Sequence, residues 1–160
     1  MIKNLLLQAI VFIAIFMFIS WIRETDMLAT DTKIEQSYVL SDLHGQQINL
    51  ATGDKPAVFY FFAPWCEICH LSIGNLQSVY EKNENLDVYA IALDFTSQQE
   101  VEKFTARHQL TFPVLLGNES VKQDFKISGY PSYYVVDEGN KVTSKALGYS
   151  TELGIYLRSL

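Results

Sequence analysis

The feature that most limits how this chain can fold is an apolar run that ends in two closely spaced cysteines. Residues 57–63 are Ala-Val-Phe-Tyr-Phe-Phe-Ala, and residues 64–70 are Pro-Trp-Cys-Glu-Ile-Cys-His. A near-continuous apolar run of this length is typical of a central strand buried on both faces. Pro64 ends that strand, and the composition becomes helical from Cys66 onward. The sequence therefore predicts a buried strand that leads a Cys-x-x-Cys pair into the first turn of a helix.

The positions of Cys66 and Cys69 fit thiol–disulfide exchange. This reaction needs one accessible cysteine that ionises readily and a second cysteine close enough to resolve the mixed disulfide. At a helix start, unpaired backbone N–H groups and the helix dipole stabilise a thiolate on Cys66, and Cys69 follows on the same helix face. We therefore expect Cys66 to attack a substrate disulfide and Cys69 to release the product.

Three other roles for a cysteine pair have to be weighed against redox chemistry. Residues 66–70 also match the Cys-x-x-Cys-His attachment motif of c-type haem, but every methionine of the chain, a common axial ligand, lies in or beside the N-terminal apolar segment. A zinc site would need more ligands than this one cysteine pair and three scattered histidines. Buried structural thiols fit poorly with a strand-to-helix turn. We expect no metal site and no cofactor besides the redox-active disulfide Cys66–Cys69.

Composition and charge indicate one ordinary globular domain. Of the 160 residues, 49% are hydrophobic and 19% are charged, which is enough apolar material for a packed core. The net charge is -6 and the basic residues do not cluster, so nucleic acid is not an expected partner. Only two cysteines are present, so the chain lacks the structural disulfides of small secreted domains.

The N-terminal segment differs from the rest of the chain. Residues 5–22 carry no charge, and a helix of this length covers about 27 Å, close to the roughly 30 Å hydrocarbon core of a bilayer. The alternative is a cleaved signal peptide, but the nearest candidate cleavage site, residues 27–29, has Met at the outer position where a small residue is required. We therefore expect residues 1–23 to be an uncleaved, single-pass membrane anchor.

The charges beside this segment predict its orientation. Lys3 and the amino terminus precede the apolar residues, whereas Arg23 is followed by Glu24 and Asp26. The positive-inside rule then places the N-terminus in the cytoplasm. We expect a protein of the cell inner membrane whose domain faces the periplasm or another extracytoplasmic space.

Beyond the anchor, the residue patterns predict a linker and one α/β domain. Residues 24–36 are polar and lack periodicity, which indicates a linker, and the domain occupies residues 37–160. Leu153, Tyr156 and Leu157 predict the packed face of a last helix. The elements that the patterns predict are a β-hairpin at 38–50, strands at 57–63, 86–93, 111–116, 132–137 and 142–147, and helices at 66–82, 97–108, 118–125 and 151–160.

Several segments around the cysteines resemble the TlpA/ResA-like branch of the thioredoxin family. The resemblance is carried by residues 59–69 at the strand and turn, and by residues 42–45, 111–116 and 129–137. It covers residues 37–160 and implies a thioredoxin-like fold, with a central mixed sheet flanked by helices and an extra N-terminal β-hairpin. An N-terminal membrane anchor is also common in that branch.

The same resemblance implies a substrate site beside the dithiol. In such proteins the proline that matches Pro131 is cis and faces the dithiol, and the preceding residue, here Tyr130, offers backbone hydrogen bonds to an extended substrate. The cis form is accessible because an X-Pro bond favours trans by only about 0.5–1 kcal/mol. Trp65 is expected to form an apolar platform beside Cys66.

Proton transfer and redox tuning are where the chain departs from thioredoxin. Thioredoxin has a buried Asp where this chain has Tyr60, while the ResA-like branch has a carboxylate after the next strand, where this chain has Asp94. Asp94 is therefore predicted to be either a proton acceptor for Cys69 or a loop-capping residue. Glu67 adds negative charge near Cys66, which opposes thiolate formation and favours a reducing protein.

Together these features predict an extracytoplasmic thiol–disulfide oxidoreductase that reduces protein disulfides and is itself re-reduced by a membrane electron donor. Its partners would be protein thiols and disulfides, with the inner membrane contacted through residues 5–22. Two alternatives stay open. One is a dithiol module that delivers copper, because copper(I) favours thiolate ligands, and the other is a periplasmic disulfide oxidase or isomerase.

Overall fold

The computed structural model describes residues 7–15, 24–50 and 53–160. In this part of the chain, strands form one mixed seven-stranded sheet with the order β2-β1-β5-β4-β3-β6-β7. The strands are β1 (Val39–Asp42), β2 (Gln47–Asn49), β3 (Ala57–Phe62), β4 (Asp87–Ala92), β5 (Val114–Leu116), β6 (Ser132–Val136) and β7 (Val142–Leu147). The helices that flank the sheet are α2 (Glu67–Lys82), α3 (Gln98–Arg107), α4 (Glu119–Asp124) and α5 (Glu152–Arg158). The predicted α/β architecture and its N-terminal hairpin are confirmed.

Strand β3 lies at the centre of this sheet. It pairs in parallel with β4 and antiparallel with β6, so both of its edges are hydrogen-bonded. Every residue of β3 is buried, as expected for a strand covered on both faces. Because successive side chains of a strand point to opposite faces, Tyr60 and Phe62 contact one core cluster while Phe59 and Phe61 contact the other.

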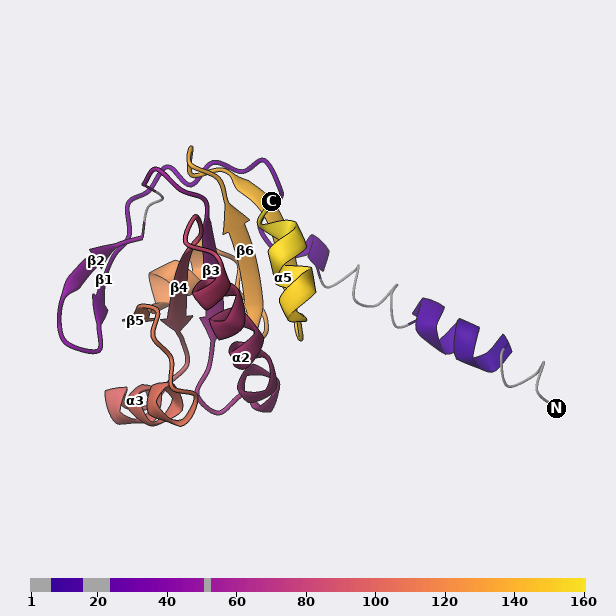
Figure 1. Cartoon of the computed structure of the whole chain (residues 1–160), viewed down its shortest axis with the longest axis horizontal. Helices are drawn as coiled ribbons and strands as arrows, with labels where there is room; N and C mark the ends of the chain where they lie inside the picture. The colour runs from indigo at the N-terminus through magenta and orange to yellow at the C-terminus, as the bar shows by residue number, and fades with distance from the viewer. Residues whose placement is uncertain (1–6, 16–23, 51–52) are drawn as a thin grey trace.

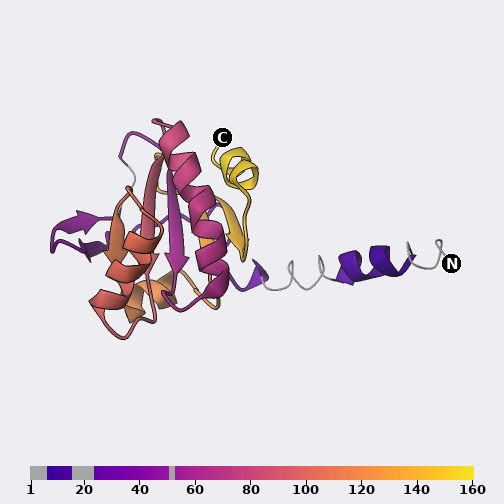
Figure 2. The same ribbon diagram turned by 60° about the horizontal axis from the view of Figure 1, so that its bottom comes forward.

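The helices divide between the two faces. In Figure 2 the magenta α2 and the salmon α3 lie in front of the strands, and Figure 1 shows α5 beside α2. Ile73 of α2, Phe104 of α3 and Ile155 of α5 belong to one core cluster. Val121 of α4 and Met27 belong to the other. Helix α2, which begins directly after β3, is therefore packed along its length and holds its N-terminal end in a fixed place.

Residues 24–36, the expected linker, contact the domain over part of their length. Met27 is buried in the core, and the Leu28 N–H donates to the Tyr134 hydroxyl at 3.1 Å. Further along, the Ile34 N–H donates to a backbone carbonyl beside β7, at Asn140. Asp31 adds an ion pair with Lys141, and its N–H donates to the Val142 carbonyl, so this segment is held on the domain by both apolar and polar contacts.

The predicted membrane anchor falls only partly within the described residues. Residues 5–6 and 16–22 lie outside them, and residues 7–15 are helical with exposed side chains. None of the helices in the described ranges combines the length and the apolar character needed to cross a bilayer. The anchor therefore stays a prediction.

The predicted packed face of the last helix is wrong. Leu153, Tyr156 and Leu157 of α5 are exposed, whereas Ile155 is buried. The reason is that α5 packs on the core through Ile155, so its other apolar residues lie on sides of the helix that do not face the core.

Candidate active site

Cys66 and Cys69 form a disulfide at the start of α2. Cys66 is the N-cap residue of the helix, with an extended backbone at φ -80° and ψ 110°, and its Sγ accepts a hydrogen bond from the Cys69 N–H at 3.1 Å. An N-terminal N–H group and the helix dipole both favour negative charge at this sulfur. In the reduced protein this position therefore stabilises a thiolate on Cys66, as the sequence pattern indicates.

The two sulfur atoms differ in their access to solvent. Both cysteines belong to one core cluster, but Cys66 keeps 7% of its surface exposed whereas Cys69 is 0% exposed. A substrate disulfide can therefore approach Cys66 but not Cys69. This asymmetry suits a nucleophile that receives the substrate and a resolving cysteine that is protected from it.

Neutral hydroxyl groups lie beneath Cys69. The Tyr60 hydroxyl lies 3.1 Å from Ser72 Oγ, and it donates at 3.5 Å to the carbonyl oxygen of Cys69. Burial, together with the neighbouring Tyr133, raises the pKa of Tyr60 well above its usual value. The position that carries an acid in thioredoxin thus holds a phenol that stays neutral.

The loop that faces the dithiol has the predicted geometry, because the Tyr130–Pro131 bond is cis. Hydrogen bonds hold both sides of this loop: the Gly148 N–H donates to the Pro131 carbonyl at 2.7 Å, and Ser132 Oγ donates to the Gly129 carbonyl at 2.8 Å. Pro131 is itself buried. The loop therefore has a defined conformation, and its Tyr130 ring contacts Trp65, the residue before Cys66.

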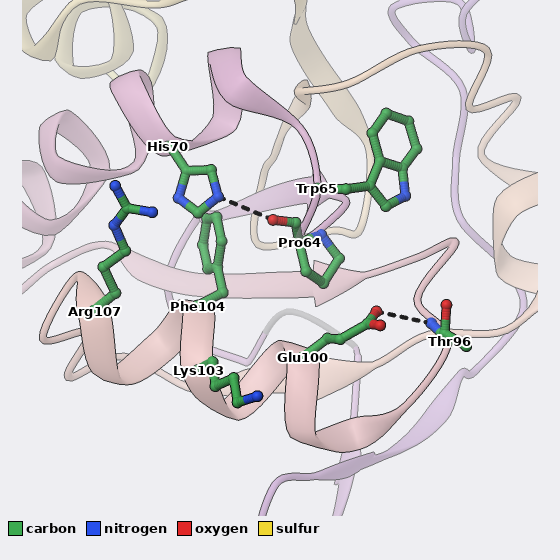
Figure 3. Close-up of a pocket in the computed structure, with 8 residues that line it drawn as sticks. All are labelled: Pro64, Trp65, His70, Thr96, Glu100, Lys103, Phe104 and Arg107. Carbon is green, nitrogen blue, oxygen red and sulfur yellow. Dashed lines mark hydrogen bonds between the residues drawn. The ribbon is translucent and has the colours of Figure 1, made fainter.

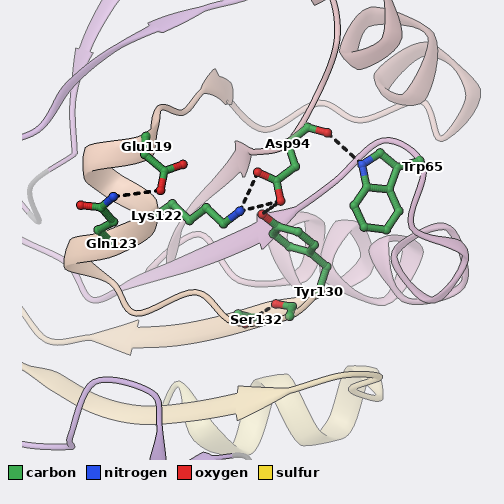
Figure 4. Close-up of polar contacts among 8 residues, drawn as sticks. Trp65, Asp94, Glu119, Lys122, Gln123, Tyr130 and Ser132 are labelled. Carbon is green, nitrogen blue, oxygen red and sulfur yellow. Dashed lines mark hydrogen bonds and ion pairs between the residues drawn. The ribbon is translucent and has the colours of Figure 1, made fainter.

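Trp65 and Tyr130 contact each other at the mouth of the site, as Figure 4 shows. Their ring centroids are 5.9 Å apart with an interplanar angle of 86°, an edge-to-face arrangement. Trp65 is 62% exposed, so most of the indole faces solvent beside Cys66. These two residues, which the sequence placed at the substrate site separately, are thus neighbours in space.

Asp94 joins this aromatic pair. Its backbone carbonyl accepts from Trp65 Nε1–H at 2.8 Å, and its Oδ2 accepts from the Tyr130 hydroxyl at 3.0 Å. Lys122 Nζ donates to both carboxylate oxygens at 2.7 Å. The hydrogen bond from Lys122 is the main cause that lowers the pKa of Asp94 below its usual range. The hydrogen bonds of this carboxylate go to Lys122 and Tyr130 and do not test a proton transfer to Cys69. The proton-acceptor role of Asp94 therefore stays a prediction.

Glu67 has a simpler setting. It lies in the first turn of α2 and is exposed, directly after the Cys66 N-cap. Its negative charge is therefore next to Cys66 in sequence but open to solvent, where screening weakens its effect on the Cys66 thiolate.

A histidine pair is the feature that the residue pattern did not reveal. His70 Nε2 lies 3.0 Å from the Pro64 carbonyl, and His70 Nδ1 lies 2.7 Å from His108 Nε2. Because a carbonyl only accepts, Nε2 of neutral His70 carries the hydrogen, and His108 Nε2–H then donates to Nδ1. Burial, followed by the charges of His70 and Arg107, lowers the pKa of His108. The helix that carries the cysteines is thus tied to the turn before it and to the end of α3.

Two hollows flank the aromatic pair. The first, of about 370 Å³, lies on the α3 side, with Pro64, Trp65 and His70 opposite Phe104, as Figure 3 shows. The second, of about 840 Å³, lies between Ile68 of the Cys-x-x-Cys segment and the loop that precedes Pro131. Within the described ranges, no group of three His, Cys, Asp or Glu side chains is arranged to hold a metal ion.

Comparison with known proteins places this geometry in a family. Residues 29–145 match the model of the AhpC/TSA family, which is more than half of the chain. The chain belongs to the AhpC/TSA family. Its relatives include the thioredoxin-like protein YneN of Bacillus subtilis, 27% identical over 121 residues that cover 72% of this chain and 70% of YneN. They also include the thiol-disulfide oxidoreductase ResA of Bacillus thuringiensis subsp. konkukian, 28% identical over 130 residues that cover 78% of this chain and 75% of ResA.

Solved structures show the same fold. StoA from Bacillus subtilis superposes with a TM-score of 0.72 at 19% identity, over 81% of this chain and 100% of StoA. A thiol:disulfide interchange protein from Chlorobium tepidum superposes with a TM-score of 0.71 at 20% identity, over 82% of this chain and 95% of that protein. The predicted thioredoxin-like fold and the TlpA/ResA-like resemblance are therefore confirmed. The chain is a thiol–disulfide oxidoreductase of this family, which works with its own cysteines and needs no cofactor.

Proposed function

We propose that the Cys66–Cys69 dithiol reduces disulfides of extracytoplasmic proteins, in a chain held at the inner membrane by residues 5–22. The observation that carries this proposal is the asymmetry of the pair: Cys66 is the helix N-cap and keeps a small exposed area, whereas Cys69 is fully buried. Such a pair presents one sulfur to a large substrate and keeps the other for the second step.

The reaction has two exchange steps. The Cys66 thiolate attacks one sulfur of the substrate disulfide, so a mixed disulfide forms and the first substrate thiolate leaves and takes up a proton. The Cys69 thiol gives up its proton and attacks Cys66 Sγ, which releases the second substrate thiolate. Two electrons pass to the substrate, and the Cys66–Cys69 disulfide remains. A dithiol donor at the membrane restores the reduced state by the reverse exchange.

The loop before Pro131 offers a binding place for an extended protein substrate. Within the part of the chain that the structure describes, no backbone hydrogen bond uses the N–H or the carbonyl of Tyr130. Tyr130 lines the larger hollow together with Ile68 of the Cys-x-x-Cys segment. A substrate segment lying there in an extended conformation can pair with Tyr130 as an added strand does.

The charge of Glu67 supports the proposed direction of electron flow. The exposed carboxylate of Glu67 follows Cys66 directly, and negative charge at this position disfavours the thiolate. A less stable thiolate corresponds to a less stable reduced form and thus to a more reducing couple. This argument supports a reductant over a disulfide oxidase or isomerase.

The membrane location rests on residues 5–22. They are uncharged, they are long enough to cross a bilayer as a helix, and Lys3 precedes them while acidic residues follow Arg23. A fusion of alkaline phosphatase after residue 160, which is active only outside the cytoplasm, tests this part. An active fusion supports the extracytoplasmic orientation, and an inactive but intact fusion contradicts it.

The function itself is tested by the reduction potential of the Cys66–Cys69 couple and by reduction of insulin. A potential of about -270 mV or lower supports a reductant, and one of about -120 mV contradicts it. Insulin reduction has to depend on Cys66, so Cys66→Ser is the control. A copper-delivery module would show no turnover that depends on this cysteine.

A further inference from the structure

One residue connects the two aromatic side chains that face a substrate. Asp94 follows β4, and it binds Trp65 through its backbone carbonyl and Tyr130 through its side chain. Trp65 comes from the turn before α2, and Tyr130 comes from the loop before β6, so neither is near Asp94 in sequence. Figure 4 shows the three groups converging at one side of the site.

The backbone of Asp94 is itself unusual. Its φ is +48°, in the left-handed region that L residues rarely adopt, although Asp is among those that tolerate it. The preceding residue is anchored to β3, because the Leu93 N–H donates to the Phe62 carbonyl at 2.8 Å. The carbonyl that receives the Trp65 indole is thus carried by a loop fixed at the end of the central strands.

Lys122 holds the other half of this arrangement. Its ammonium group contacts both oxygens of the Asp94 carboxylate, and the two side chains are only 28% and 37% exposed. Lys122 lies on α4, so the contact links the active-site mouth to a helix on the other face of the sheet. A carboxylate held from both oxygens keeps one orientation, and Oδ2 then presents a fixed acceptor to the Tyr130 hydroxyl.

We propose that Asp94 and Lys122 are positioning residues that hold Trp65 and Tyr130 as a fixed aromatic wall beside Cys66 and thereby favour protein substrates over small disulfides. The inference rests on the proposed function, because it takes Trp65 and Tyr130 as substrate contacts. Binding of a protein segment to a rigid wall costs less conformational entropy than binding to two mobile rings, which would have to become ordered. A small disulfide reaches Cys66 with little contact to that wall and gains less from it.

This role differs from proton transfer to or from Cys69. An ion pair with Lys122 makes the Asp94 carboxylate a weak base, and its hydrogen bonds lead toward the mouth of the site. The group that contacts Cys69 is instead the Tyr60 hydroxyl, which donates to the Cys69 carbonyl and lies 3.1 Å from Ser72 Oγ. The two roles therefore predict different behaviour of the same variants.

The test compares Asp94→Asn and Lys122→Gln in steady-state reduction of insulin and of hydroxyethyl disulfide, a small uncharged substrate. For both variants the KM for insulin should rise about 5- to 20-fold while kcat changes less than about twofold, since the loss is one of substrate positioning. The kcat/KM for hydroxyethyl disulfide should fall by a smaller factor. Tyr130→Phe, which removes only the hydroxyl contact, should raise the KM for insulin about two- to fivefold.

The matched control is the ion pair between Lys82 and Glu152. It joins the far end of α2 to α5, with both side chains exposed. Glu152→Gln should leave the KM for both substrates unchanged. The reduction potential and the urea midpoint of each variant show whether the dithiol and the fold are intact, and Lys122→Gln decides the question if Asp94→Asn does not fold.

Two results would overturn the positioning role. An unchanged KM for insulin in both folded variants is the first. The second is a pair of opposite effects on the pH–rate profile, in which Asp94→Asn slows exchange and Lys122→Gln speeds it. That result would assign Asp94 the role of a base, because loss of Lys122 would make it a better one. If wild-type protein fails to reduce insulin, the proposed function and this inference fail together. If the wild-type protein reduces insulin normally and both variants keep its KM, only this inference is rejected.

Discussion

The two cysteines lie three residues apart, yet their surroundings are opposite in character. Around Cys66 lie the exposed ring of Trp65 and the partly buried ring of Tyr130, and both residues are hydrogen-bonded to Asp94, which pairs with Lys122. Around Cys69 it places buried side chains and neutral hydroxyls, and Tyr60 is the largest of them. The substrate side is therefore organised by charge, and the resolving side is organised by packing.

This difference shows how the site separates two tasks. Charged groups at the mouth are partly exposed, so pH and salt can weaken them. Neutral hydroxyls in the core are insensitive to pH near neutrality because burial raises the pKa of Tyr60 further. We expect variants on the substrate side to change recognition, and variants on the resolving side to change stability and the second chemical step.

The largest effect should come from the cysteines themselves. Cys66→Ser removes the nucleophile, so insulin reduction should fall by on the order of 10³-fold or more, to the uncatalysed background. Cys69→Ser also stops turnover, but it leaves the first exchange intact and should accumulate a mixed disulfide with the substrate.

Mass spectrometry under non-reducing conditions distinguishes these two results. The mixed disulfide should appear with Cys69→Ser and be absent with Cys66→Ser. If the trapped species formed on Cys69 in the Cys66→Ser protein, the buried cysteine would be the accessible one, and the comparison made above would be reversed.

The second effect in size concerns the end of β4, which carries Asp94. A Cβ added at Gly117 would lie 2.7 Å from a methyl group of Leu93 and 2.8 Å from the Ala92 carbonyl. Gly117→Ala should therefore lower the free energy of unfolding by about 1–3 kcal/mol, because the two strand ends must separate. Urea denaturation measures this loss.

Gly74→Ala is the matched control on the resolving side. Gly74 lies within α2, and an added Cβ there meets nothing within 4 Å. Replacing a helical Gly by Ala should raise the free energy of unfolding by up to about 1 kcal/mol. A loss at Gly74 as large as that at Gly117 would show that α2 is packed more tightly than the structure indicates.

The resolving side was the more predictable from sequence. Residues 57–62 form a buried strand because the seven consecutive apolar residues 57–63 leave no face for solvent, and Cys66 follows as a helix start. The strand and the helix start depend on a few adjacent residues and on burial, which a sequence pattern records directly. The cis bond before Pro131, on the substrate side, was predicted only from the family resemblance.

The substrate side could not be predicted in the same way. Asp94 meets Lys122 and Tyr130 only because β4 lies between β5 and β3 and because α4 returns to the strand ends. Such contacts join residues about 30 positions apart through side-chain geometry, which periodicity does not describe. The hydrogen bond between His70 and His108 was missed for the same reason.

The third effect tests the neutral side beneath Cys69. Tyr60→Phe leaves the buried Ser72 Oγ without the hydroxyl that lies 3.1 Å away. The free energy of unfolding should fall by about 1–2 kcal/mol, the range for a buried polar group that loses its partner. Tyr80 lies on α2, the helix that carries Ser72, and its half-buried ring packs on Phe112. Tyr80→Phe should change the free energy of unfolding by less than about 0.5 kcal/mol. Equal effects of the two substitutions would mean that the Tyr60 hydroxyl has no part in the core.

The smallest effect should be the pH dependence of the substrate side. The pKa of Asp94 is lowered from 3.8, mainly by the hydrogen bond from Lys122, so the folded protein favours the carboxylate more than the unfolded chain does. The resulting stabilisation is present above the ordinary pKa of the carboxyl group and is lost as the pH falls through the lowered folded value. Because Asp94 is partly exposed, solvent screening limits this contribution to about 1 kcal/mol or less.

Urea midpoints of wild-type protein and Asp94→Asn, measured from about pH 6 to about pH 3, should therefore converge as the carboxylate takes up its proton. The control Glu152→Gln lacks the exposed pair with Lys82 but keeps Asp94. The difference between its urea midpoint and that of Asp94→Asn should therefore stay constant only at pH values where Asp94 is ionised. A gap between wild type and Asp94→Asn that persists unchanged to the acid limit would mean that the substitution acts through the packing and hydrogen bonds of the side chain and not through its charge, because Asn keeps the backbone carbonyl that binds Trp65. The mouth of the site would then be organised by packing, as the resolving side is, and not by charge.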